Sequence, residues 1–135
     1  MKMIRKANDI IELAIRVNTA IEVACMVCNI LEKDFHSRSR LRHIIDARRI
    51  VYSYCRETLR MSWLEIAKQF KINHATAIHH CKIHKQLVDC DTFYFSKHNA
   101  FMKLINEEIT LVDIDNLIQM AKKLKENEKD TCQKE

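Results

Sequence analysis

The sequence contains no glycine and no proline. A loop that cradles phosphates needs backbone without a Cβ close to the ligand, so the absence of glycine excludes the Gly-rich motifs that bind nucleotides. Turns that require a positive φ must use Asn, Asp or Ser, or be avoided. The sequence therefore predicts an all-α fold, with helices joined by short polar links and with no nucleotide or other cofactor.

Long apolar runs are also missing, and the basic residues 1–6 lead into polar residues instead of the apolar core of a signal peptide. No membrane partner is therefore expected. The six cysteines fit a reducing compartment, where a cysteine acts mainly as a small buried hydrophobe and disulfides are rare. We expect a cytoplasmic protein, associated with a bacterial nucleoid or, if a phage encodes it, located in the host cytoplasm.

Apolar residues recur at helical spacing through most of the chain, and polar residues interrupt them at a few places. The pattern predicts a connector helix over residues 1–18 and a helix-turn-helix domain over 19–90, in which a capping box at Thr19 opens a new helix. A helical extension over 91–125 is expected to pack on this domain, with one helix capped at Asp91 and a last helix capped at Thr110. The tail 126–135 has the composition of a disordered segment.

Two helices joined by a short link lie at the centre of the predicted domain. Ser62 and Glu65 form a capping box that opens a helix of about two turns, which is expected to turn Leu64 and Ile66 inward. A tight connection then leads to Asn73, an N-cap residue type, and a second helix is expected to run to about Val88. This arrangement is typical of a helix-turn-helix.

Positive charge is concentrated in the middle of the chain. Between Ser37 and Asp89 there are eleven basic and four acidic residues. The net charge of this block, +7, exceeds the +5 of the whole chain. At the start of this block, residues 36–40 form a polar, basic link before a helix expected over 41–59. Such a block predicts an anionic partner, most commonly nucleic acid, although charge alone fits a solvated helical surface equally well.

The second helix of the pair carries residue types suited to reading DNA. In a helix-turn-helix, this helix enters the major groove with its N-terminal residues at the base edges, while nearby cations hold phosphates. His74 can contact a thymine methyl or an acceptor, Ala75 allows close approach, and the Thr76 hydroxyl can bond to a base or a phosphate. His79 and Lys82 lie further along, where a helix in the groove meets the backbone.

Three short motifs between Thr19 and Leu87 combine into one pattern. They are Ala47-Arg48, then Glu65-Ile66-Ala67 with Phe70, and His74-Ala75-Thr76-Ala77-Ile78-His79. The pattern resembles that of the C-terminal DNA-binding domain (domain IV) of the bacterial replication initiator DnaA, which is a Trp repressor-like helical fold. The resemblance implies a stand-alone DnaA-like protein that binds double-stranded DNA in replication initiation or transcription control, without the family's ATPase module.

The resemblance also implies roles for the arginines. Arg40 falls where the family's basic-loop arginine enters the minor groove, and a narrow A·T-rich groove attracts such a side chain. Arg48 falls on the arginine that opens the long helix, and Arg56 falls where a basic side chain approaches the bases. Arg49 stands where the family usually has glutamine, and it still offers a hydrogen-bond donor to a phosphate. The candidate DNA-binding residues are therefore Arg38, Arg40, Arg42, Arg48, Arg49, Arg56, Asn73, His74, Ala75, Thr76, His79 and Lys82.

The sequence departs from the family pattern around the turn. The turn before Asn73 is one residue shorter and lacks glycine, and Asn73 and Ala75 replace an Asp and a Ser or Thr. Loss of the Asp removes an acceptor for cytosine amino groups, so the DNA sequence that the family prefers is not expected to carry over. Asn73 itself can cap the helix or bond adenine, and capping is the commoner role.

A metal site is one alternative use of the cysteines and histidines. It would need the CxxC of Cys25 and Cys28 together with His80, Cys81 and His84. Because the CxxC lies in an apolar helical run, packing explains its small thiols, and no metal is predicted.

The main alternative function is a protein-interaction module that binds a replication or transcription protein without specific DNA recognition. Trp63, Ile72 or the C-terminal helices would then form the contact. RNA binding ranks below both, because the major groove of an A-form helix is too narrow to admit a protein helix. No spacing of nucleophile and base indicates catalysis, so an enzyme is not predicted.

Overall fold

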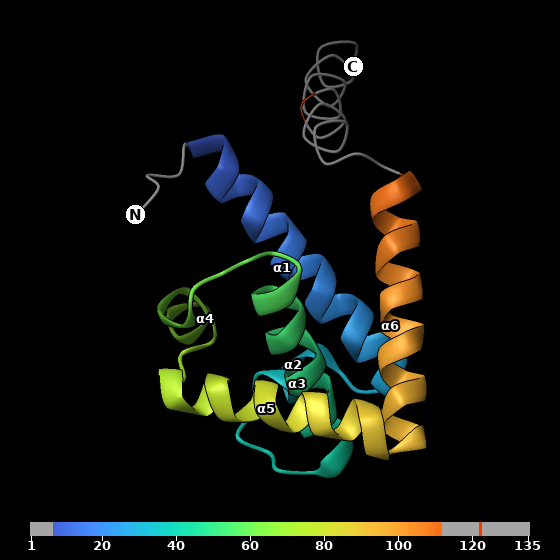
Figure 1. Ribbon diagram of the computed structural model, residues 1–135. Coiled ribbons are helices and arrows are strands. Elements are labelled where there is room, and N and C mark those ends of the chain that lie inside the picture. Colours follow the sequence, from blue (N-terminus) through green and yellow to red (C-terminus); the bar gives the residue numbers. More distant parts are fainter. Residues whose placement is uncertain (1–6, 112–121, 123–135) are drawn as a thin grey trace. The chain divides into compact units, whose positions relative to one another are not determined.

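The computed structural model describes residues 7–111 and 122, and every regular element in them is an α-helix (Figure 1). In chain order the helices are α1 Ala7–Cys28, α2 Glu32–Phe35, α3 Arg42–Glu57, α4 Trp63–Phe70, α5 His74–Cys90 and α6 Thr92–Leu111. The predicted all-α fold is confirmed. None of these helices is both long and apolar enough to cross a bilayer.

The chain divides into two compact units, and the boundary falls inside α6. The first unit ends at Ile105, and the second begins at Asn106. Helix α6 continues through Thr110, where the sequence predicted a new helix. The remainder of that predicted helix, the tail 126–135 and the first six residues of the connector helix lie outside the described residues, so the predicted division into domains stays a prediction.

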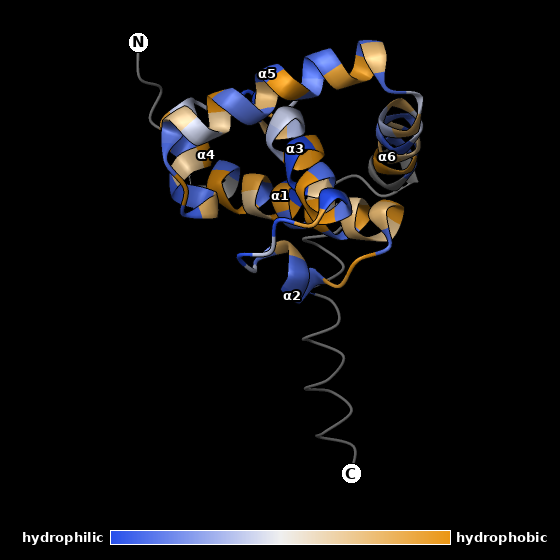
Figure 2. Ribbon diagram, turned by 90° about the horizontal axis from the view of Figure 1, so that it is seen from below, coloured by the Kyte–Doolittle hydropathy of each residue, from blue (hydrophilic) through white to orange (hydrophobic). Residues whose placement is uncertain are grey.

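Helix α3 is the centre of the first unit. It packs against α1 and α5 and also contacts α2 and α4. In the view of Figure 2, α3 lies between α1 and α5. Ile44, Ile50, Val51 and Cys55 on α3 are at most 3% exposed, and burying an aliphatic side chain of this size contributes about 2 kcal/mol. The helix-turn-helix therefore rests on a hydrophobic core that α3 organises.

The helix start predicted at Thr19 is wrong, because α1 runs without interruption from Ala7 to Cys28. The Thr19 hydroxyl does not cap a helix. It donates a hydrogen bond of 2.9 Å to the carbonyl of Ile15, four residues earlier in the same helix. Val17 and Ala20 on either side are fully buried, so one apolar face continues through the predicted boundary and holds the helix together.

Three helices are followed within three residues by a residue in the left-handed conformation, although the chain has no glycine for this purpose. Asn29 has the residue type that was expected, whereas Arg60 and Lys71, with φ of 55°, do not. The amide after Arg60 bonds back to α3 at 3.0 Å, and the amide after Lys71 bonds back to α4 at 3.0 Å. These bonds close the helix ends and offset the strain of about 1–2 kcal/mol per residue.

Helix α4 begins with the predicted capping box. The Ser62 hydroxyl accepts from the Glu65 amide, and the Glu65 carboxylate accepts from the Ser62 amide, both at 3.1 Å. Ile66 faces the core and is fully buried, but Leu64, which was also expected to point inward, is 63% exposed. Two residues correspond to a rotation of about 200°, so a short helix that buries Ile66 turns Leu64 to solvent.

Helix α6 is joined to α5 by Asp91, which was predicted to cap it. The Asp91 carboxylate accepts from the Tyr94 amide at 3.1 Å, and this bond, helped by Arg42, holds the pKa of Asp91 below its usual value. Tyr94 and Phe101 then pack into the core at 1% and 0% exposed. Lys97 on the same helix pairs with the buried Asp46 of α3 at 3.1 Å and ties the two helices together.

Candidate nucleic-acid interface

The turn between α4 and α5 sets the direction of α5. Lys71 adopts the left-handed conformation and ends α4, and Asn73 is extended and begins α5. The Asn73 side-chain oxygen accepts from the Ala75 amide at 3.0 Å, so the capping role predicted for Asn73 is confirmed. The cap uses the amide oxygen, which leaves the side-chain nitrogen as the group that can meet a ligand.

Helix α5 has one side in the core and one side in solvent. Ala77, Cys81 and His84 recur at helical spacing and are buried. The candidate contact residues of the second helix are all exposed: Asn73, His74, Ala75, Thr76, His79 and Lys82. The first turns of α5 are therefore presented to solvent, and the buried histidine His84 is a core position that the sequence analysis did not find.

The basic loop, residues 36–41, is held in shape by Arg48 on α3. The Arg48 guanidinium donates to the carbonyls of Phe35 at 2.9 Å, Asp34 at 3.2 Å and Ser39 at 2.7 Å. It also donates to the carbonyl of Ser37. A planar cation with several donors suits this cluster of acceptors, and most of its hydrogen-bonding capacity is used inside the protein.

Two arginines of the basic loop remain available. Arg38 and Arg40 are exposed, and neither makes a hydrogen bond or an ion pair with any residue that the structure describes. Between them, the Ser39 hydroxyl accepts from the Leu41 amide at 3.3 Å, which adds a second constraint on the loop. The loop therefore fixes its backbone while it leaves two guanidinium groups in solvent.

A hollow of about 760 Å³ separates the basic loop from the start of α5. Arg38 of the loop, Arg48 of α3, Lys71 of the turn and Thr76 and His80 of α5 all line it. The structure thus brings the loop and the first turns of α5 to the same region. Lys71 is exposed here and was missed by the sequence analysis, although a basic residue just before an N-cap is a signal that could have found it.

Arg42 lies at the first residue of α3 and is held by two carboxylates. It pairs with Asp46 at 3.2 Å and with Asp91 at 2.9 Å, and Asp46 is the main cause of its raised pKa. Its side chain is 62% exposed. Arg42 can reach a phosphate only by leaving these partners.

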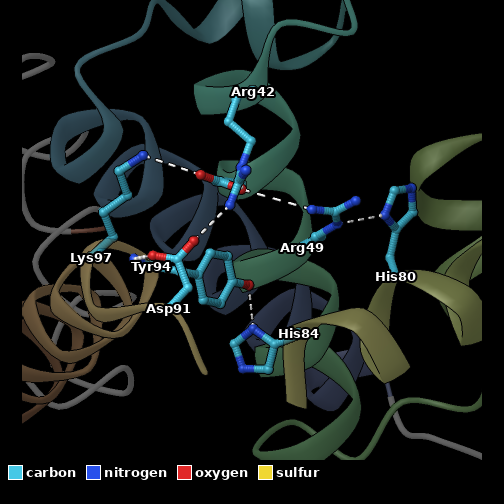
Figure 3. Close-up of polar contacts among 8 residues, drawn as sticks. Arg42, Arg49, His80, His84, Asp91, Tyr94 and Lys97 are labelled. Carbon is cyan, nitrogen blue, oxygen red and sulfur yellow. Dashed lines mark hydrogen bonds and ion pairs between the residues drawn. The ribbon is translucent and has the colours of Figure 1, made fainter. Parts of the chain in front are cut away.

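Arg49 is a largely enclosed member of the predicted contact residues. Its side chain is only 15% exposed, and its Nε donates to His80 Nδ1 at 3.3 Å while its guanidinium lies 3.8 Å from Asp46 (Figure 3). Burial, together with the charge of Arg49, lowers the pKa of His80 to about 4, so the ring stays neutral and accepts this bond. Arg49 therefore links α3 to α5.

Arg56 lies near the other end of α3. It donates to the Met61 carbonyl at 3.1 Å and stacks on the Trp63 ring, with 4.4 Å between the guanidinium carbon and the ring centroid. Fourteen residues of helix separate Arg42 from Arg56, which is about 20 Å. The structure therefore groups Arg38, Arg48 and Thr76 around one hollow and leaves Arg42 and Arg56 at opposite ends of α3.

Four cysteines of the first unit, Cys25, Cys28, Cys55 and Cys81, are core residues, whereas Cys90 is exposed. Burial raises the pKa of Cys25 and Cys28 to about 11 and that of Cys55 to about 12, so these groups remain thiols at neutral pH. The described residues contain no cluster of three or more side chains that could hold a metal ion. Packing accounts for the CxxC in α1.

Two helices joined by a tight turn, with the second helix exposed at its start and supported by a third, define a helix-turn-helix domain. Residues 17–83 match the family described as bacterial DnaA protein helix-turn-helix. Residues 17–83 therefore form a domain similar to the DnaA C-terminal helix-turn-helix domain, and the resemblance stated from the sequence is confirmed. No match was found among curated proteins.

The family match indicates what the domain binds. A helix-turn-helix of this family is a DNA-binding module, and double-stranded DNA is the partner that it indicates. This points to a binding role instead of a catalytic one. The exposed start of α5 is consistent with such a role, because a helix must be free of protein contacts on the side that enters a groove.

Proposed function

We propose that the domain recognises a specific DNA sequence by placing the first turns of α5 in the major groove and Arg40 in the adjacent minor groove. His74, Ala75 and Thr76 are the proposed base contacts, and they support the proposal because all three are exposed at the start of the helix. The observation that carries the proposal is this exposed helix start, with an arginine loop across the same hollow.

Phosphate contacts are assigned to the cations that have no partner among the described residues. Arg38, Lys71 and Lys82 are exposed in this way, and the N-terminal end of the α5 helix dipole adds a weak positive pole. Each neutralised phosphate adds about 0.9 to the slope of log affinity against log salt. Arg48 and Arg49 act mainly by holding the loop and α5 in position.

The proposed biological role is the control of replication initiation or of transcription, by occupying a DNA site. A replication or transcription protein as a second partner, and a cytoplasmic location, remain predictions from the sequence. The role follows from the kind of domain, and the target sequence must be found by experiment.

Selection from random duplexes at near-physiological salt tests sequence recognition. The intact chain should enrich one motif, and His74→Ala should change the preferred bases, with about 1–3 kcal/mol at stake for a good base contact. Lys103→Ala removes an exposed charge on α6, away from the helix-turn-helix, and should leave the motif and the affinity unchanged.

Weak binding without enrichment would contradict specific recognition. A protein-interaction module would then be the better description, and the exposed Leu64 of α4, at 63%, would be the first contact to test.

A further inference from the structure

A second hollow, of about 470 Å³, lies between α3, α5 and α6, and no proposed DNA contact lines it. We refer to it as the rear pocket. Ser53 and Tyr54 of α3, His84 of α5 and His98 and Met102 of α6 are among the residues that line it. Ten residues of α5 separate its start from His84, a distance of about 15 Å. The rear pocket is therefore distinct from the proposed DNA interface.

Three polar atoms in the lining are buried without a hydrogen-bond partner among the described residues: Ser53 Oγ, Tyr54 OH and His98 Nδ1. Ser53 and Tyr54 are each only 4% exposed, and the Cys81 thiol, which interacts with the Ser53 hydroxyl, is a weak hydrogen-bonding group. An unsatisfied buried polar group costs about 1–3 kcal/mol, so such groups are rare. Three of them in one hollow indicate a place built to receive hydrogen bonds.

The charges around the rear pocket disfavour an anion. At its edge Lys85 pairs with Glu57 at 3.4 Å, and Asp89 adds a second carboxylate. The two histidines carry no charge at neutral pH: burial lowers the pKa of His84 to about 4 and also lowers that of His98. An uncharged ligand suits these surroundings best.

The walls of the rear pocket favour a flat ligand. The His84 and His98 rings meet edge to face, with centroids 4.7 Å apart, and Val88 and Met102 supply apolar contacts. The Tyr94 hydroxyl is already bonded to His84 Nδ1, which fixes the orientation of that ring (Figure 3). The volume falls within the range of about 300–1,000 Å³ that is usual for small-molecule sites.

We propose that the rear pocket binds a neutral heterocycle of one or two rings, which forms hydrogen bonds with Ser53, Tyr54 and His98 and packs against Val88 and Met102. The ligand supplies both donors and acceptors, because each hydroxyl can act in either sense. This site is independent of DNA binding and can be tested on the free protein.

The first test measures probe binding by NMR on the intact chain with labelled methionine methyl groups. The probes are adenine, cytosine, indole and benzimidazole at neutral pH. Binding of at least one probe should shift the Met102 methyl signal and saturate, and Met61, which is 2% exposed and does not line the pocket, should not move. The proposal is overturned if Met102 responds to none of the four probes or if Met61 shifts equally.

The second test uses two matched substitutions that each remove one tyrosine hydroxyl. Tyr54→Phe removes an unpartnered hydroxyl, so the melting temperature should stay the same or rise, while the affinity for a bound probe falls about tenfold. Tyr94→Phe removes a hydroxyl bonded to His84 and should lower the melting temperature. If Tyr54→Phe destabilises as much as Tyr94→Phe, or leaves probe affinity unchanged, the hydroxyl has another role and the proposal fails.

Discussion

Arg60 and Lys71 hold left-handed backbone conformations that a glycine would adopt without strain. Both residues follow a helix, and the hydrogen bonds that close α3 and α4 fix their conformation. Lys71 lies at the proposed DNA interface, whereas Arg60 is exposed and makes no hydrogen bond or ion pair with the described residues. A substitution at Arg60 therefore measures the energetic cost of a left-handed residue other than glycine after a helix, without affecting the proposed DNA interface.

Arg60→Gly should raise the free energy of unfolding by about 0.5–1 kcal/mol. Relief of the left-handed strain stabilises the folded protein by about 1–2 kcal/mol. The greater conformational freedom of glycine in the unfolded chain opposes this by about 0.4–1 kcal/mol. Urea denaturation of both proteins measures the difference. Asn29→Gly is the matched control and should gain less, because asparagine tolerates this conformation better. Equal gains at the two positions would show that strain is not the cause.

At the scale of the elements, Arg48 connects α3 to the basic loop. Its guanidinium bonds to carbonyls of Phe35, Ser39 and Asp34, so the loop keeps its shape through one side chain. The family resemblance placed Arg48 among the DNA contacts, and the structure shows in addition that it organises the segment that carries Arg38 and Arg40. Its effect on DNA binding should therefore include the effects of its neighbours.

Arg48→Ala should weaken binding to all duplexes to a similar degree. It should also reduce the slope of log affinity against log salt by at least about 0.9, the contribution of one phosphate contact. It should also speed amide hydrogen exchange in residues 36–41, since the carbonyls that hold the loop in shape lose the guanidinium that donates to them. Arg40→Ala is the matched comparison: it should reduce the salt slope but leave exchange in the loop unchanged. If Arg48→Ala changes amide exchange in the loop and the salt dependence of binding no more than Arg40→Ala does, Arg48 does not organise the loop.

The sequence predicted the elements that depend on local rules. The capping box at Ser62 and the N-cap at Asn73 are set by neighbours within three residues, and both were correct. The predicted start at Thr19 was wrong because tertiary burial of α1 outweighs a local capping signal. Likewise, residue type alone could not separate the exposed Arg40 from the enclosed Arg49, because that depends on Asp46 and His80 across the fold.

At the scale of the whole first unit, one buried and two half-buried histidines link α5 to the other helices. His80 accepts from Arg49 of α3, and His84 bonds to Tyr94 of α6. His98 of α6 meets the His84 ring, and Lys85 and Arg48 add nearby positive charge. All of these surroundings favour the neutral imidazole, so the packing of α5 depends on histidines that stay unprotonated.

Stability should therefore fall as the pH is lowered from 7 to 5. The pKa of His80 and of His84 is about 4 in the folded protein, against an ordinary value of 6.5, so between these values the unfolded chain binds protons that the folded protein does not. The loss at pH 5 is on the order of 2 kcal/mol for His84 and smaller for the half-buried His80 and His98. Urea denaturation at a series of pH values measures it. His84→Gln should make stability less dependent on pH, while the control His43→Gln, at an exposed position, should not. A stability that is constant from pH 7 to 5 would show that these rings are already protonated or solvated in the folded state.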